Sequence, residues 1–304
     1  MISVRRRTAA CLVTSLLRFD AKNLGQQNIF HIVPGRYQGE RSASVALGGV
    51  CRGLASPGAE PPTIGRKMTM TAKEILQEIK PLGSDSYKRV IFNHGVKEPC
   101  FGVKISDLQK IVKRIKRDYQ LALDLYDTGI YDAMYLAGLI ADDARMTKKD
   151  LQHWVAKANC AALGGTTVAW VAAGSPHGWE LAREWIDSKT PLIAAAGWAT
   201  LGSLVSVKDD SEFDLAELKR LLQRMQKNIH QAPDVVRRQM NLFVIAIGSY
   251  VEPLTDTAIQ TGEKIGVVTV DAGNTSCQVP FAPAYIRKVQ KRGGIGKKRK
   301  TAKC

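Results

Sequence analysis

The sequence has few cysteines, few aromatic residues and no long apolar run, and each shortage excludes a class of protein. Six irregularly spaced cysteines in 304 residues are too few for a disulfide scaffold, so we expect reduced thiols and a cytoplasmic protein. No apolar run reaches the roughly 18 residues that a membrane-spanning helix needs, so we expect no membrane partner. No Cys-x2-Cys or His-x3-His pair occurs, so we predict no metal site and no cofactor.

Acidic residues are missing from the C-terminal end, and this places much of the net charge of +16 there. Residues 287–304 hold nine Lys and Arg and no acid, and residues 1–67 hold ten basic residues against three acids. The remaining segment, 68–286, has 25 basic and 25 acidic residues. A concentrated basic excess indicates a polyanionic partner, and here that inference applies mainly to the tail.

The first 67 residues lack the periodicity of the rest. Arg5, Arg6 and Arg7 precede a short apolar run and then polar, Gly- and Pro-rich sequence. We weigh a targeting peptide against upstream sequence preceding a true start at Met68 or Met70. Under both interpretations we expect residues 1–67 to be disordered and to lie outside the fold.

From Thr71 onward the pattern is helical. The segments 130–142, 161–173, 191–205 and 235–251 are apolar nearly all round, and they alternate with amphipathic segments at 147–158, 177–187 and 214–230. A helix that is apolar on every side must be buried on most sides. One covered and one half-exposed helix every 20 to 50 residues is typical of a stacked helix-pair solenoid. An ordinary helical bundle is the alternative.

Local signals support helix starts along this region. Thr71 with Glu74 and Ser106 with Gln109 have the spacing of capping boxes, and Thr147 and Asp214 stand where N-caps are expected. Val267 to Val270 is the one β-branched run of note. We therefore divide the chain into a solenoid at 71–266, an irregular segment at 267–286 and a basic tail at 287–304.

Three stretches resemble the HEAT-like repeat DNA alkylation repair family, which includes bacterial alkylpurine DNA glycosylases. They are Phe101–Lys110, Leu121–Tyr126 and Gly129–Ala137, and the likeness runs from about Thr71 to Tyr250. The resemblance implies an all-α, armadillo-like superhelix of HEAT-like repeats. It also implies duplex DNA bound in a concave basic groove and excision of cationic alkylpurines.

The active-site pattern of that family carries over poorly. The family places a Trp-Asp-x-x-Asp segment on its inner face, whereas this chain has Thr166 about where the second aspartate should be. The inward arginine of the family falls near Ala194, and its second aromatic wall falls near Tyr250. A carboxylate stabilises the oxocarbenium-like sugar by charge, which a threonine hydroxyl does not supply.

Substitute residues are therefore weak candidates. Asp132 and Asp234 could supply the carboxylate, although a helix cap or an ion pair explains each of them as well. Trp170 and Trp198 lie on apolar helices and, with Tyr250, are our candidates for aromatic residues lining a groove, where they could pack on deoxyribose or on a flipped base.

The C-terminal part, from Met240, resembles a subgroup of this family without demonstrated chemistry. Its basic residues, together with two arginines that precede it on the same helix, are our candidate nucleic-acid contacts: Arg237, Arg238, Arg287, Lys288, Lys297, Lys298, Arg299, Lys300 and Lys303. Such contacts predict salt-sensitive binding that is largely blind to sequence. The sequence thus favours a DNA-binding protein of alkylation repair, with RNA as another ligand and without the usual glycosylase chemistry. An active glycosylase with substitute residues and a protein-interaction solenoid remain the alternatives.

Overall fold

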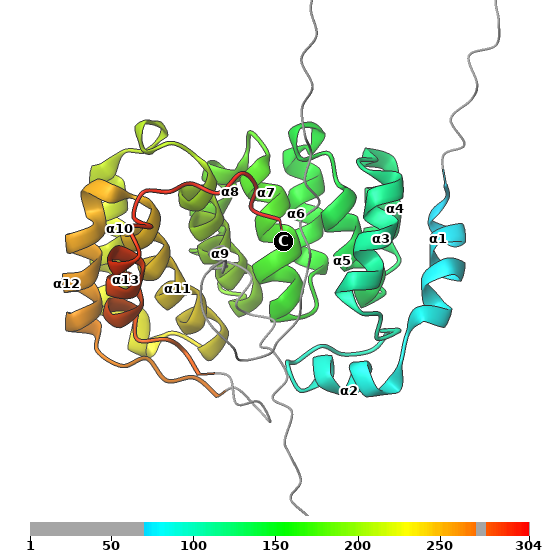
Figure 1. Cartoon of the computed structure of the whole chain (residues 1–304), viewed down its shortest axis with the longest axis horizontal. Coiled ribbons are helices and arrows are strands. Elements are labelled where there is room, and N and C mark those ends of the chain that lie inside the picture. The colour runs from blue at the N-terminus through cyan, green and yellow to red at the C-terminus, as the bar shows by residue number, and fades with distance from the viewer. Residues whose placement is uncertain (1–69, 272–277, 304) are drawn as a thin grey trace, which may run out of the picture. The chain divides into compact units, whose positions relative to one another are not determined.

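The computed structural model of the chain describes residues 70–271 and 278–303. Residues 1–67, which we predict to lie outside the fold, are outside this range. Within it the secondary structure is helical, apart from one isolated antiparallel bridge between Gly83 and Val103 (Figure 1). The prediction of an all-α protein is confirmed.

Thirteen α-helices make up the described body. They are α1 (Ala72–Ile79), α2 (Asp85–Phe92), α3 (Ile105–Ile115), α4 (Tyr119–Asp127), α5 (Tyr131–Ile140), α6 (Lys148–Lys157), α7 (Ala169–Gly174), α8 (Gly178–Trp185), α9 (Pro191–Val207), α10 (Leu215–Asn228), α11 (Asp234–Tyr250), α12 (Thr255–Ile265) and α13 (Ala282–Lys291). A π-helix, η4 (Leu163–Val168), leads directly into α7.

The helices alternate between an inner and an outer layer, as their hydrophobic patterns predict. Every residue of α5 is buried, and α9 is buried from Ala194 to Ser206. The outer helix α10 instead buries a single stripe: Leu218, Leu221, Leu222 and Met225. Each inner helix packs on its outer partner and on the next inner helix, so that α9 contacts α7, α8 and α11. This repeat is that of a helix-pair solenoid.

The inner helices α9 and α11 run parallel. The rings of Trp198 and Phe243 lie 5.6 Å apart, and one turn later along both helices Gly202 faces Ala246. Parallel stacking places the positive, N-terminal ends of these helices on one edge of the array and the negative, C-terminal ends on the other. We call these the N-terminal edge and the C-terminal edge.

Most predicted caps are confirmed, and one is wrong. Thr71 and Thr147 form capping boxes, and the Asp214 side chain accepts a hydrogen bond from the Ala216 N–H. Ser106 is not an N-cap: α3 begins at Ile105, and its N-cap residue, Lys104, has no capping side chain. A difference of two residues in a helix start is hard to predict from sequence.

The region after α12 also differs from the sequence-based division. The chain leaves α12 through Gly266 at φ 75°, and Val267 to Val270, which we placed in an irregular segment, lies in no strand of the described residues. Helix α13 crosses our expected boundary between an irregular segment and a tail, and it packs on α11 and α12.

No single described helix is both long and apolar enough to cross a membrane. One sharply bent pair, Asp234–Tyr250 with Glu252–Ile265, passes by length and composition alone.

Candidate nucleic-acid interface

The residues after α13 cross the C-terminal edge of the inner helices instead of extending away from the body (Figure 1). The Gly296 N–H donates to the Ser249 carbonyl at 3.0 Å, near the end of α11. The Arg299 N–H donates to the Ser206 carbonyl at 2.7 Å, near the end of α9. We call residues 292–303 the C-terminal strap.

The side chain of Lys298, one of the predicted phosphate contacts, is bound to groups of the protein itself. Its ammonium group donates to the Val205 carbonyl at 2.9 Å and to the Asp210 carboxylate at 2.7 Å. A cation at the C-terminal end of a helix interacts favourably with the helix dipole and satisfies a carbonyl that has no partner within the helix.

Lys303 repeats this arrangement at another inner helix. Its ammonium group donates to the Ala141 carbonyl at 2.9 Å, just beyond α5, and pairs with Asp143 at 2.7 Å. The Lys303 side chain is 16% exposed; burial lowers its pKa, and the nearby Asp143 opposes that shift. Five extended residues span at most about 18 Å, roughly two helix spacings, which fits a strap from α9 past α7 to α5.

The other basic candidates differ in whether their side chains are already paired within the protein or exposed to solvent. Arg237 donates to the carbonyls of His230, Ala232 and Thr269, and Arg287 pairs with Glu263. Four of the candidate residues are exposed, Arg287, Lys288, Lys297 and Lys300, and of these Arg287 is the one paired with an acid, Glu263.

Arg238 is the exception on the N-terminal edge. It is partly buried, and its guanidinium makes no hydrogen bond or ion pair within residues 70–271 and 278–303. Burial lowers its pKa, and the negative charge of Asp234 opposes that shift. A guanidinium withdrawn from water without hydrogen-bonded partners is costly, so Arg238 is the basic residue best suited to an external anion.

The three candidate groove aromatics are core residues. Trp170 is fully buried and meets the Tyr135 ring edge-on at 5.8 Å, and Tyr250 is 1% exposed. Trp198 is 2% exposed and packs on Phe243. Trp170 and Tyr250 are thus enclosed between neighbouring helices, because inner helices that are apolar all round bury their large side chains. Trp198 is also buried but lines a crevice between α9 and α11, so its role in a groove stays a prediction.

Asp132 has a structural role in place of the catalytic one that we considered. Its carboxylate is 1% exposed and accepts hydrogen bonds from the backbone N–H groups of Phe101 at 2.6 Å, Gly102 at 3.3 Å and Val103 at 2.7 Å. It lies in the first turn of α5, where a negative charge is favoured. With its oxygens engaged in this way, Asp132 anchors the 101–103 loop to the N-terminal edge.

Asp234 is more accessible. It begins α11, its carboxylate accepts a hydrogen bond from the Asp271 N–H at 2.7 Å, and it pairs with Arg237 at 3.3 Å. These contacts tie the segment after α12 to the start of α11. They leave the carboxylate partly exposed, so a catalytic role for Asp234 stays a prediction.

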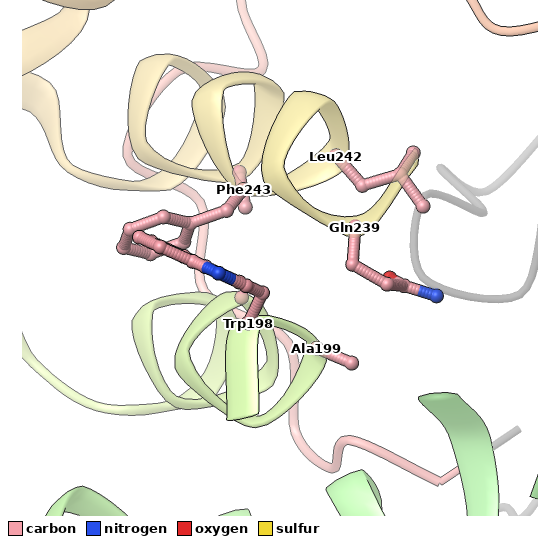
Figure 2. A pocket seen from close by; sticks show the side chains of 7 residues that line it. Trp198, Ala199, Gln239, Leu242 and Phe243 are labelled. Atoms are coloured by element: carbon pink, nitrogen blue, oxygen red, sulfur yellow. The ribbon is translucent and has the colours of Figure 1, made fainter. Parts of the chain in front are cut away.

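A narrow crevice separates α9 from α11 close to Arg238. It is lined by Trp198, Ala199, Gly202, Gln239, Leu242, Phe243 and Ala246. Figure 2 shows Ala199, Gln239 and Leu242 on one side of the helix pair and the two aromatic rings on the other. Gln239 is 7% exposed, and its amide oxygen is without a hydrogen-bond partner in the described part of the chain. No local sequence pattern predicts this buried acceptor.

The π-helix η4 lies beside this crevice. We expected an uninterrupted helix at 161–173, but six residues from Leu163 to Val168 adopt the wider π form. A side chain on Gly165 would meet the Gln239 amide nitrogen at 2.7 Å, so the glycine permits close approach of η4 and α11. The Thr166 hydroxyl donates to the Ala162 carbonyl within the π-helix. π-Helical turns occur frequently at functional sites.

Comparison with known proteins identifies the family. The family model described as DNA alkylation repair enzyme matches residues 75–285. This chain belongs to the DNA alkylation repair family. An uncharacterised protein of Listeria innocua, Lin0241, is 28% identical over 228 residues, which is 73% of this chain and 99% of the relative. Its counterpart in Listeria monocytogenes, Lmo0209, is 27% identical over 228 residues, with the same coverage.

A solved structure adds the fold. It comes from a group described as a new family of proteins related to the HEAT-like repeat DNA glycosylases, with affinity for branched DNA structures. The match has a TM-score of 0.72 and 32% identity, and it covers 77% of this chain and all of the other. The HEAT-like solenoid expected from the sequence is thus confirmed for this member of the DNA alkylation repair family.

Proposed function

We propose that this member of the DNA alkylation repair family binds DNA, and branched DNA in particular, by contacts to the sugar-phosphate backbone. The observation that carries the proposal is the match over the full length of a structure whose family has affinity for branched DNA. The proposed contacts are Arg238, which makes no ion pair within the described part of the chain, and the exposed Lys288, Lys297 and Lys300. Backbone contacts position a nucleic acid without reading its sequence.

We propose further that binding proceeds without the usual glycosylase chemistry. Thr166 carries no charge, its hydroxyl is engaged by the Ala162 carbonyl, and Asp132 is occupied by three backbone N–H groups. Stabilising an oxocarbenium-like sugar requires a charge that neither of these residues can offer. Asp234 is the remaining candidate of the two carboxylates, and its partial exposure favours it as the residue to test if the chain is a glycosylase.

The test measures binding and chemistry in the same samples. Full-length protein is mixed with a labelled four-way DNA junction, with a duplex of equal length carrying N7-methylguanine, and with an RNA duplex as competitor. We expect salt-dependent binding with preference for the junction and base release at the spontaneous rate. Release that Asp234→Asn abolishes would establish the glycosylase alternative, and absence of binding to all three would favour a protein partner.

A further inference from the structure

The last helix, α13, has one buried and one exposed face. The buried residues, on the side that packs against α11 and α12, are Ala282, Pro283, Ile286 and Val289. The opposite face, beginning directly before the helix, exposes residues spaced by three, four and three positions: Phe281, Ala284, Lys288 and Lys291. Because residues at these spacings lie on one side of a helix, they form a single row about 15 Å long.

The lysines of this row make no ion pair among the described residues. Residues 287–304 contain no Asp or Glu, and an acid of the neighbouring helix α12, Glu263, is already paired with Arg287. Figure 1 shows the C-terminal strap running on from α13 across the array, so that further exposed cations follow the row. We call the exposed basic residues of this face and of the strap the basic track: Lys288, Lys291, Arg292, Lys297 and Lys300.

Phe281, at the start of the row, is the one exposed aromatic residue in the part of the chain that the structure describes, and it is 38% exposed. Its backbone is fixed on both sides. The Pro280 carbonyl accepts a hydrogen bond from the buried Asn241 side chain at 2.9 Å. The Phe281 carbonyl accepts one from the Tyr285 N–H at 3.1 Å. The ring is therefore held at a defined place on the surface, where it is available for stacking.

We propose that α13 and the C-terminal strap bind an unpaired strand at the branch point of DNA, with a base stacked on Phe281 and phosphates along the basic track. This inference rests on the proposed function and names the part of branched DNA that is recognised. Proteins that bind single strands combine aromatic stacking platforms with a positively charged path for the backbone. A duplex hides the faces of its bases, so the exposed ring favours an unpaired strand over a paired arm. At about 3.4 Å per stacked nucleotide, the row on α13 spans about four nucleotides.

The experiment uses the full chain and two fluorescent DNA forks that differ in one arm, which is single-stranded in the first fork and paired with its complement in the second. Affinities are measured by anisotropy at constant ionic strength. We expect the wild-type chain to bind the first fork about tenfold more tightly. Phe281→Ala should remove that preference, because it removes the stacking platform, and Phe281→Trp should keep it. Leu82→Ala is the matched control, since Leu82 is also an exposed apolar residue.

The lysines of the row are tested on the same forks. Lys288→Gln and Lys291→Gln should each lower the slope of log affinity against log salt for the first fork by up to about one. Lys149→Gln, on an exposed lysine of the outer helix α6, should leave that slope unchanged. Thermal unfolding of each variant checks that it folds.

A second measurement separates the unpaired strand from the proposed function. The single-stranded arm carries 2-aminopurine, whose fluorescence is quenched when the base stacks on an aromatic ring. We expect quenching by the wild-type chain and by Phe281→Trp but not by Phe281→Ala. Equal affinity of the wild-type chain for both forks, with quenching that Phe281→Ala retains, would overturn the unpaired-strand inference and leave DNA binding intact. A free single strand bound as tightly as the first fork, with no binding to a four-way junction, would overturn the branched-DNA proposal alone.

Discussion

The two edges of the inner helix layer differ in how their charged side chains are paired. At the C-terminal edge the cations come from the C-terminal strap. Lys298 and Lys303 each donate to a carbonyl near or just beyond a helix end and pair with an acid that follows the helix. At the N-terminal edge Asp132 fixes one loop, but among the described residues Arg238 makes no ion pair with an acid. We infer that the C-terminal edge contributes to stability and that DNA binds at the N-terminal edge.

The comparison shows that a basic composition has two uses. Parallel helices leave a row of partial negative charges at one edge, and lysines there stabilise the protein itself. Charges used in this way are withdrawn from an external polyanion. Counting basic residues therefore overestimates how many of them can contact phosphate.

The largest effect is expected from removing the acid that holds the N-terminal edge together. Asp132→Ala leaves three buried N–H groups without their acceptor and should lower the free energy of unfolding by about 3 kcal/mol or more. Asp132→Asn keeps one acceptor and should cost less. Urea unfolding followed by circular dichroism measures both, with the exposed Asp124→Ala as control. A fully stable Asp132→Asn chain would return Asp132 to the catalytic candidates.

The contribution of the C-terminal edge to stability can be tested by removing the Lys303 ammonium group. Lys303→Met leaves Asp143 partly buried without its cation and should lower the free energy of unfolding by about 1–3 kcal/mol. Lys300→Met, on an exposed side chain of the same strap, should change it by less than about 0.5 kcal/mol. Equal losses in the two variants would contradict the docked strap.

Two adjacent arginines on α11 allow a paired and an unpaired guanidinium to be compared at the same edge. Arg237→Gln removes hydrogen bonds to three carbonyls and should cost about 1–2 kcal/mol. Arg238→Gln relieves a partly buried, unpaired charge and should leave stability unchanged or raise it by up to about 1 kcal/mol. Thermal unfolding of the pair decides this. A larger loss for Arg238→Gln would mean that its guanidinium stabilises the fold.

The smallest effect concerns the salt dependence of DNA binding. Lys300→Gln or Lys297→Gln should each reduce the slope of log affinity against log salt by up to about one, because an exposed lysine can release one counterion. Lys298→Gln should leave the slope unchanged, since its ammonium is already paired. The slopes come from junction titrations at several salt concentrations. A reduced slope for Lys298→Gln would show that the strap leaves the body to grip DNA.

Much of the architecture could be predicted from local sequence. Apolar helices such as 191–205 had to be inner, and amphipathic ones such as 214–230 had to be outer, because burial follows the apolar face. Thr71 and Thr147 marked helix starts correctly. The π form of Leu163–Val168 could not be predicted, because no local pattern marks it; in the structure it packs closely on α11 at Gly165.

The site was harder to predict than the fold. Arg238 was among nine basic candidates, and Gln239 was not a candidate at all, since contacts between distant repeats leave no local pattern. The aromatic candidates failed for the opposite reason. Trp170 and Tyr250 were correctly assigned to inner helices, but the sequence alone did not show which face of an inner helix is covered.

The sequence by itself determined the helices, their division into two layers, the family and the absence of a charged residue at Thr166. Only the tertiary structure decided the use of the charges. Lys303 becomes part of the framework because stacking brings Ala141 and Asp143, far away along the chain, to its ammonium group. Within the described residues Arg238 makes no ion pair, because Asp234, the acid that acts on it, is paired with Arg237. Charge is a property of a residue, whereas its partner depends on the packing of the whole array.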